Sequence, residues 1–442
     1  MKEHLTLKTV FFFFLPLLFM MELVQLSHSV TNAFLARFPD PTEALAAFSI
    51  AFAFNSTAGG VTFTSTQTGI CFITDRTSCI RLFRFFGLVV MVPFCILELT
   101  SLTPIGKTVF GDWMGASPGV VLHAMRASAI MGLWTFPILI RNFCYAIVML
   151  NRRTILITYA TAVRLVSLVV FLFLFSLWFN GAVVGALATV SGMIVEALYM
   201  VIVARPYFLR LDRDVDQPAT YGEIWRFSWP LMITQVSENG VMFIINFFLG
   251  NLVNPDLAIA SFGVVYGLLR LLLSPLRNLV QAIQALVRKR EDIRAILQFT
   301  VAMILFYIGL NLLMFYTPLK AWILGGLMGL DLELSGYSAP GVRLIFVVAI
   351  FWAASSLLRG LLSAMRKTGF IAVTAGIRLA VLAAIGGISF FCPDINGAVL
   401  GVLAFAGSFA VETAVLGRHF QRQAKAPGPL FPSNSSHSGH PA

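Results

Sequence analysis

The feature that most constrains this chain is a sequence segment that occurs twice in similar form. Residues 180–196 read NGAVVGALATVSGMIVE, and residues 396–412 read NGAVLGVLAFAGSFAVE. The shift between these two segments is 216 residues, and most other matches lie 214 residues apart, as Pro16 and Pro230 do. Further matches are Arg152-Arg153-Thr154 with Arg366-Lys367-Thr368, Arg164 with Arg378, Asn32 with Asn246, and Phe48 with Phe262. The chain therefore consists of two homologous halves.

Both halves are strongly apolar. Of the 442 residues, 58% are hydrophobic and 12% are charged, whereas ordinary soluble domains carry roughly 25% charged residues. Apolar stretches long enough to cross a hydrocarbon core as helices recur along the whole sequence. They are residues 9–36, 43–73, 80–104, 117–148, 153–178, 182–204, 222–250, 256–287, 293–317, 337–365, 370–391 and 396–420. The Phe-rich start at 11–16 is not a cleaved signal, because its segment is the repeat partner of 222–250.

These stretches predict an all-α polytopic membrane protein with twelve transmembrane helices in two homologous six-helix bundles. The expected boundaries are an N-terminal bundle at 1–204, a cytoplasmic linker at 205–221 and a C-terminal bundle at 222–422. The polar, proline-containing tail at 423–442 is expected to be disordered. Because six is even, both halves insert in the same orientation. Tandem halves of this kind are typical of alternating-access transporters, whose substrate site lies between the halves.

The basic residues predict the orientation, since cytoplasmic loops are enriched in Lys and Arg. With both termini in the cytoplasm of an inner or plasma membrane, only Arg37, Lys107 and Lys320 lie in outer segments. The inner segments hold Lys2, Lys8, Arg76, Arg81, Arg84, Arg152, Arg153, Arg205, Arg210, Arg213, Arg226, Arg288, Lys289, Arg290, Arg294, Arg366, Lys367, Arg418, Arg422 and Lys425. Topology thus accounts for the net charge of +11, and nucleic-acid binding is not expected.

No motif for catalysis or for ATP hydrolysis occurs in the sequence. No extramembrane segment is long enough to hold a nucleotide-binding domain, and the five cysteines do not follow a metal-binding spacing. We therefore expect neither an enzyme nor a cofactor or metal site. The sequence favours a secondary transporter for a small molecule, in which H⁺ or Na⁺ is a possible coupling ion.

Charged residues within the apolar stretches are the candidates for function, because each costs about 2.5–3.5 kcal/mol to insert and needs a partner or water. The arginines are Arg126, Arg141, Arg164, Arg270, Arg277, Arg343, Arg359 and Arg378. The acids at comparable depth are Glu22, Glu196, Glu238 and Glu412. Arginines outnumber these acids about two to one, which favours an anionic substrate.

The repeat divides these charges into two groups. Arg164 corresponds to Arg378 and Glu196 to Glu412, and the members of each half lie at matched depths on neighbouring helices. We predict that Arg164–Glu196 and Arg378–Glu412 are structural ion pairs. Charges without a counterpart are better candidates for the substrate path. The predicted path residues are Arg270, Arg277, Arg359, Arg141, Arg343, Glu22, His28, Asn32, Glu238 and Asn246.

Within that path, Arg270 and Arg277 are predicted to be unpaired positive charges. They lie seven residues apart on one helix face, and their first-half equivalents are Ser56 and Phe63. The path itself is predicted between the halves, lined by the first, second, seventh and eighth helices. Arg277 lies close enough to the cytoplasmic end of its helix to snorkel, which is the alternative for that residue.

Several motifs resemble the progressive ankylosis family, which belongs to the multidrug/oligosaccharidyl-lipid/polysaccharide exporter superfamily. These are GICFITDRT at 69–77, Phe136-Pro137, FSWPL at 227–231 with Asn246, and the series Arg343, Arg366-Lys367-Thr368, Arg378, 396–401 and Glu412. The resemblance implies a fold like that of the multidrug and toxic compound extrusion transporters. It also implies export of small polyvalent anions such as ATP, pyrophosphate or citrate, and it carries Arg343, Arg378 and Glu412 over as family positions.

The chain departs from the family pattern after Pro230. Asn239 and Met242 stand where the family has arginines, and Glu238 stands where it has glutamine. These departures leave a lipid-linked polysaccharide flippase or a drug or cation antiporter open as alternatives. A major facilitator-type transporter also has two parallel halves, but 69–78 lacks the spacing and the later glycine of its loop motif. A membrane protein that does not transport is the remaining alternative.

Overall fold

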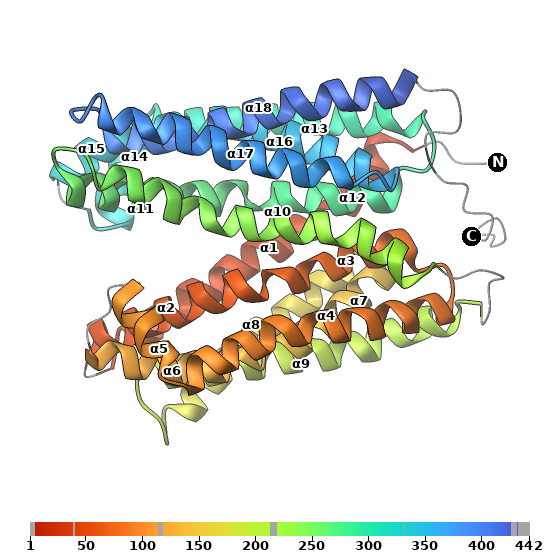
Figure 1. Ribbon diagram of the computed structural model, residues 1–442, viewed down its shortest axis with the longest axis horizontal. Coiled ribbons are helices and arrows are strands. Elements are labelled where there is room, and N and C mark those ends of the chain that lie inside the picture. Colours follow the sequence, from red (N-terminus) through yellow and green to blue (C-terminus); the bar gives the residue numbers. More distant parts are fainter. Residues whose placement is uncertain are drawn as a thin grey trace. The chain divides into compact units, whose positions relative to one another are not determined.

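The structure is a computed structural model that describes residues 5–38, 40–113, 118–212, 219–330, 332–425 and 431. All its regular elements are helices within those ranges (Figure 1). In the first half they are α1 (Leu7–Leu35), α2 (Pro41–Ala58), the 3-10 helix η1 (Gly59–Phe63), α3 (Thr64–Phe72), α4 (Arg76–Leu102), α5 (Ile105–Lys107), the π-helix η2 (Thr108–Trp113), α6 (Pro118–Gly132), α7 (Thr135–Leu150), α8 (Ile155–Phe175) and α9 (Ala182–Leu209). In the second half they are α10 (Tyr221–Leu249), α11 (Pro255–Leu273), η3 (Ser274–Arg277), α12 (Asn278–Leu286), α13 (Asp292–Phe315), α14 (Leu319–Ala321), the π-helix η4 (Trp322–Leu327), α15 (Leu332–Arg343), α16 (Ile345–Ala364), α17 (Gly369–Gly386), η5 (Gly387–Phe390) and α18 (Gly397–Lys425).

The two halves have the same element order apart from η5, which occurs only in the second half, and this confirms the duplication read from the sequence. Helices α1 and α10 begin and end 214 positions apart, and so do α3 and α12. The packing pairs are also repeated: α8 with α9 and α17 with α18, α7 with α9 and α16 with α18, and α3 with α7 and α12 with α16. Even the backbone repeats its irregularities, because Arg152 after α7 and Arg366 after α16 both adopt positive φ angles, of 57° and 58°.

The duplicated NGAV-x-G phrase is explained by close helix packing. Gly185 of α9 faces the ring of Phe48 in α2, and a Cβ atom on Gly185 would lie 2.7 Å from that ring. The equivalent Gly401 of α18 faces Phe262 of α11, where a Cβ atom would lie 2.3 Å from the ring. Both phenylalanines are buried. The phrase is therefore a packing motif that each half needs separately.

We expect Gly401→Ala to destabilise the protein by about 1–3 kcal/mol, because the added methyl group overpacks against a buried ring. The measurement is the thermal unfolding midpoint of the purified protein. Gly309→Ala is the matched control: Gly309 lies in the exposed face of α13, and a Cβ atom there has no heavy atom within 4 Å. Equal midpoints for Gly401→Ala and the control would contradict this explanation.

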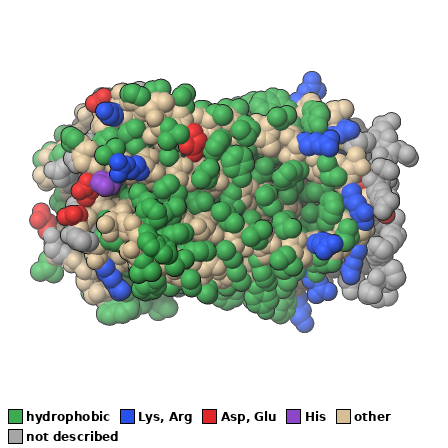
Figure 2. Space-filling model, turned by 90° about the horizontal axis from the view of Figure 1, so that it is seen from below, with side chains coloured by type: hydrophobic (Ala, Val, Ile, Leu, Met, Phe, Trp, Pro, Cys, Tyr) green, Lys and Arg blue, Asp and Glu red, His purple; other side chains and the backbone are tan. Residues whose placement is uncertain are grey.

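The helices account for the predicted membrane spans. In the described part of the chain, eleven helices are long and apolar enough to cross a membrane, and α10 adds a twelfth if its parts Tyr221–Glu238 and Gly240–Leu249 form one bent span. Large apolar side chains such as Leu88 of α4, Val166 of α8 and Ile202 of α9 are exposed. Figure 2 shows apolar side chains covering the middle of one face, with Lys and Arg side chains near both ends and more of them near one end. The chain is an integral membrane protein.

Some predicted spans are interrupted. The stretch predicted at 43–73 consists of α2, η1 and α3, and the one at 256–287 consists of α11, η3 and α12. Gly59-Gly60 starts η1, while Pro275 lies in η3 and removes a backbone donor there. The predicted linker also starts too early, because α9 continues to Leu209. In the predicted tail, 423–425 belong to α18, and the remainder lies outside the described residues except for 431.

The helices form two compact units, which we call the N-bundle and the C-bundle. The N-bundle contains Leu15–Val236, and the C-bundle contains the residues up to Phe14 and those from Ser237 to the end of α18. The first helix of each half is thus divided between the units, whereas the predicted boundaries placed each first helix wholly within its own half. All contacts described below lie within one unit.

Candidate functional site

Each bundle encloses a carboxylate on its last helix that is surrounded by arginines. In the N-bundle this is Glu196 of α9, and in the C-bundle it is Glu412 of α18; both side chains are fully buried. Helical periodicity positions them, because each glutamate lies four residues from buried neighbours on one helix face that packs against the two preceding helices. These neighbours are Gly192 and Met200 in α9, and Ser408 and Leu416 in α18. We call these groups the N-cluster and the C-cluster.

The N-cluster is formed around Glu196. The Arg141 guanidinium of α7 lies 2.8 Å from the carboxylate, and Arg164 of α8 lies 3.5 Å from it. The Tyr145 hydroxyl donates a hydrogen bond of 2.6 Å to Oε1, and the Thr161 hydroxyl donates one of 3.3 Å to the same atom. Two arginines therefore face one carboxylate, which leaves one positive charge in excess.

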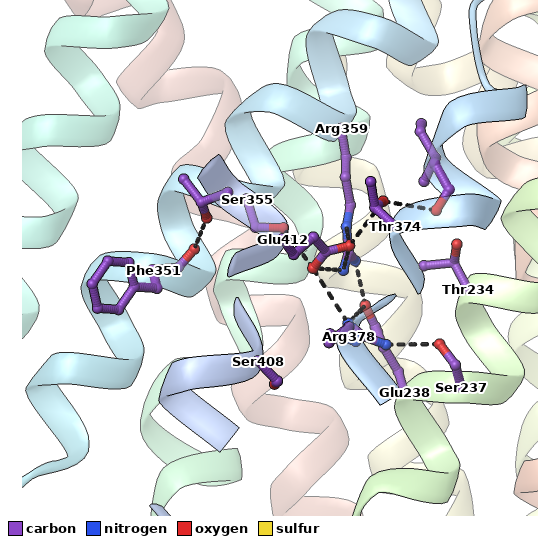
Figure 3. A network of polar contacts seen from close by, with 12 residues as sticks. Thr234, Ser237, Glu238, Phe351, Ser355, Arg359, Thr374, Arg378, Ser408 and Glu412 are labelled. Carbon is purple, nitrogen blue, oxygen red and sulfur yellow. Dashed lines mark hydrogen bonds and ion pairs between the residues drawn. The ribbon is translucent and has the colours of Figure 1, made fainter. Parts of the chain in front are cut away.

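The C-cluster is larger (Figure 3). Arg359 of α16 reaches both oxygens of Glu412, with Nη2 at 2.7 Å from Oε1 and 2.5 Å from Oε2. Arg378 of α17 lies 3.8 Å from Glu412. A second carboxylate, Glu238 of α10, lies 2.6 Å from Arg359, 3.5 Å from Arg378 and 3.3 Å from Arg277 at the end of η3. Three arginines face two carboxylates, so one positive charge is again in excess.

The structure brings together the residues that the sequence assigned to structural ion pairs. The distances are 3.5 Å for Arg164–Glu196 and 3.8 Å for Arg378–Glu412. In both bundles, however, the shorter contact is made by an arginine assigned to the substrate path, which is Arg141 at 2.8 Å or Arg359 at 2.5 Å. Comparison of the halves did not identify Arg141 and Arg359 as partners of the glutamates, because neither aligns with an arginine. Arg141 corresponds to Ser355, and Arg359 corresponds to Tyr145.

Helix geometry explains why the arginine that binds the glutamate occupies a different position in each half. Residues four apart share one face of a helix, so 141 and 145 in α7, like 355 and 359 in α16, all point to the glutamate. The order is Arg then Tyr in the first half and Ser then Arg in the second. The Ser355 hydroxyl indeed donates to Glu412 at 3.0 Å. The sequence analysis did not predict four polar partners of the glutamates, which are Tyr145, Thr161, Ser355 and Thr374. Tyr145 and Ser355 could have been found by aligning the two halves, because they align with Arg359 and Arg141.

The prediction that Arg277 is unpaired was wrong, because Arg277 forms an ion pair of 3.3 Å with Glu238. The first-half equivalents of these two residues are Phe63 and Val24, so only the second half carries these two charges, and they compensate each other. Arg270 differs: within the described parts of the chain it has no ion pair, and its guanidinium carbon lies 5.9 Å from the centre of the Tyr266 ring.

The remaining predicted path residues lie outside the two clusters. Arg343 ends α15, is exposed, and lies 5.6 Å from the ring centre of Tyr316. The His28 ring of α1 meets Phe52 edge to face, with centroids 4.4 Å apart. Glu22 is half-buried and without an ion pair to any described residue, Asn32 is exposed, and the Asn246 Oδ1 is buried without a hydrogen-bond partner in the described structure.

The described residues contain no group of three or more His, Cys, Asp or Glu side chains that could hold a metal ion. The buried carboxylates are instead turned toward guanidinium groups. A carboxylate that accepts several charge-assisted hydrogen bonds has its lone pairs occupied and is a poor cation ligand. The arrangement suits the binding of negative charge.

The fold matches solved transporter structures over almost the whole chain. A MATE transporter in complex with MaD3S has a TM-score of 0.74 at 15% identity, covering 95% of this chain and 97% of that one. The eukaryotic MATE transporter AtDTX14 has a TM-score of 0.72 at 14% identity, covering 94% and 95%. The chain has the MATE fold. This fold excludes the major facilitator alternative.

A further match is a transporter of the MOP superfamily from Pyrococcus furiosus, with a TM-score of 0.70 and 16% identity, covering 95% of this chain and 97% of that one. That protein was described as having a binding pocket of reverse polarity, which suggests a different function. No protein-family model matches the sequence of the present chain. A comparison with curated proteins finds no match either.

Proposed function

We propose that this protein is a secondary transporter that exports a small polyvalent anion by alternating access. The observation that carries the proposal is the excess of buried arginine over buried carboxylate in both clusters, two to one in the N-cluster and three to two in the C-cluster. Uncompensated charge within a membrane protein is tolerated mainly beside water or a ligand of opposite charge. A MATE fold with such an interior suits an anion better than a cationic drug.

Three further observations support the proposal. Arg270 on α11 adds a positive charge without an ion pair to any described residue, and it repels Arg277 electrostatically. The Pyrococcus furiosus protein, which was described as having a binding pocket of reverse polarity, shares the fold, so the fold is compatible with pockets of different polarity. The sequence motifs resemble the progressive ankylosis family, and membership of that family remains a proposal. The resemblance names ATP, pyrophosphate and citrate as substrates to test.

The test compares metabolites in the medium of cells that express the protein with the medium of cells that lack it. We expect accumulation of an organic or phosphate-bearing anion, and at least a several-fold smaller accumulation for Arg270→Gln, because this change removes positive charge without breaking an ion pair. Arg126→Gln is the matched control, since Arg126 is an exposed arginine of α6. A reporter fused after Ala442 shows whether the termini are cytoplasmic, which we propose from the distribution of Lys and Arg.

Two results would oppose this proposal, and a third would remove one residue from it. Identical media with and without a well-expressed protein oppose transport itself. Accumulation of a cation or of a lipid-linked sugar favours the other substrate classes of the superfamily. Unchanged export by Arg270→Gln removes Arg270 from the substrate path but leaves the transport proposal standing.

A further inference from the structure

The two carboxylates of the C-cluster are held in different ways. Glu412 receives two nitrogens of Arg359 in a fork, together with hydroxyl donors from Ser355 at 3.0 Å and Thr374 at 3.4 Å. Its side chain is fully buried. Bidentate pairs of this kind have a fixed geometry and are strong. Glu412 is therefore a structural member of the cluster.

Glu238 is held only by the tips of guanidinium groups. Within the described structure its hydrogen bonds and ion pairs all go to arginines: Arg359 Nη1 at 2.6 Å, Arg277 Nη2 at 3.3 Å and Arg378 Nη1 at 3.5 Å. Among the described residues, no hydroxyl or backbone group donates to this carboxylate. Each arginine gives it one nitrogen, which is the arrangement expected for a small anion bound in an arginine site. Figure 3 shows two of the three, Arg359 and Arg378, beside Glu238.

The exposure of these groups places Glu238 at the accessible side of the C-cluster. The side chains of Arg378 and Glu412 are 0% exposed, whereas Glu238 is 12% exposed and its partner Arg277 is 24% exposed. An anion that reaches the cluster from its exposed side therefore meets Arg277 and Glu238 before it meets the inner pair. A carboxylate at this place either repels the anion or has to be displaced by it.

The duplication gives an independent reason to separate Glu238 from the structural core. Glu412 and Arg378 correspond to Glu196 and Arg164 of the N-cluster, and Arg359 of α16 plays the part that Arg141 of α7 plays there. Glu238 and Arg277, in contrast, stand where the first half has Val24 and Phe63. The N-bundle forms its buried cluster without a carboxylate at that position. Glu238 is thus an addition to the core arrangement that the second half alone carries.

We propose that Glu238 is an internal competitor that occupies the substrate's anion site and must leave it when substrate binds. The inference rests on the proposed anion transport and deepens it by naming the chemical class of the bound group. Withdrawal of Glu238 leaves Arg277, Arg359 and Arg378 against Glu412 alone, an excess of two positive charges. The site then suits a group with two negative charges, and guanidinium groups bind phosphoryl oxygens especially well.

Competition of this kind lowers the apparent affinity by the fraction of time for which the site is free. It also speeds release, since the carboxylate returns to the arginines as the anion departs. A transporter needs both properties, because three arginines opposed by Glu412 alone hold a divalent anion tightly and so release it slowly. Glu238 therefore sets the balance between binding and release.

The experiment measures the binding of pyrophosphate to the purified protein by calorimetry, with citrate as a second probe that carries carboxylates only. We expect Glu238→Gln to bind pyrophosphate at least about tenfold more tightly than the unaltered protein. Glu333→Gln is the matched control, because it removes one negative charge from an exposed position at the start of α15. Its affinity is expected to be unchanged. Tighter binding of citrate without tighter binding of pyrophosphate overturns the phosphoryl assignment.

Each other outcome has a defined meaning. If the unaltered protein binds pyrophosphate and folded Glu238→Gln binds it equally or less tightly, the competitor inference is overturned while the proposed function stands. If neither protein binds either probe, both proposals fall. If Glu238→Gln does not fold, Glu238→Asp keeps the charge but shortens its reach to the three guanidinium groups. That variant is expected to bind more tightly than the unaltered protein, and unchanged binding overturns the inference.

Discussion

Replacement of Glu412 by glutamine is expected to abolish the accumulation of folded protein. The substitution leaves Arg359 and Arg378 buried with Glu238 as their nearest remaining carboxylate, and it breaks a contact of 2.5 Å. Removal of one member of a buried pair typically costs about 3–5 kcal/mol, because the partner charge stays in a medium that solvates it poorly. A loss of this size is a large part of the stability of an ordinary protein, which is about 5–15 kcal/mol.

The measurement is the yield and the thermal midpoint of the monodisperse protein after extraction from membranes. Glu196→Gln is expected to behave in the same way, because Glu196 holds the equivalent place in the N-cluster. Glu43→Gln is the control: Glu43 lies 3.7 Å from His123, and both side chains are well exposed, at 39% and 43%. Exposed pairs contribute about 0–1 kcal/mol. A Glu412→Gln protein with the yield and midpoint of the control would show that the C-cluster does not hold the bundle together.

The sequence predicted the fold because two simple signals agreed. Apolar stretches of bilayer length repeat along the chain, and the duplicated phrase fixes which stretch of one half corresponds to which stretch of the other. The equivalence extends to small elements, since the π-helices η2 and η4 begin 214 positions apart. What the sequence could not supply is the interruption of the spans at η1 and η3, because length and hydropathy do not distinguish one long helix from two short ones joined by a tight turn.

The candidate site was predicted in part, for a reason that individual residues make clear. Duplication of Arg164 and Glu196 as Arg378 and Glu412 indicated a charge pair in each half, and those residues do lie within 4 Å of each other. The same logic misassigned Arg277. Absence of a counterpart in the first half was treated as absence of a partner, although Glu238 lacks a counterpart too. Such a compensating gain becomes visible only when both residues are placed in space.

The exchange between α7 and α16 gives the second large prediction. Arg359→Tyr, a change to the residue of the first half, is expected to destabilise the protein by about 3–5 kcal/mol because Glu412 loses its forked partner. Ser355→Arg combined with Arg359→Tyr restores the first-half order of Arg141 and Tyr145. We expect this double variant to recover most of the lost stability, since position 355 already faces Glu412, with the Ser355 hydroxyl 3.0 Å from Oε2. The Tyr145 hydroxyl, 2.6 Å from Glu196, shows what the new tyrosine contributes.

Stability and transport are expected to separate in the double variant. Arg359 Nη1 also contacts Glu238 at 2.6 Å, whereas an arginine introduced at 355 lies one helical turn away from that position. The rescue of folding should therefore leave anion export at least several-fold below that of the unaltered protein. Thermal midpoints of the single and double variants measure the coupling between 355 and 359, which for contacting residues is about 0.5–3 kcal/mol. A double variant no more stable than Arg359→Tyr contradicts the helix-face argument, whereas full recovery of export assigns Arg359 to the structure alone and leaves Arg277 and Arg378 to bind the anion.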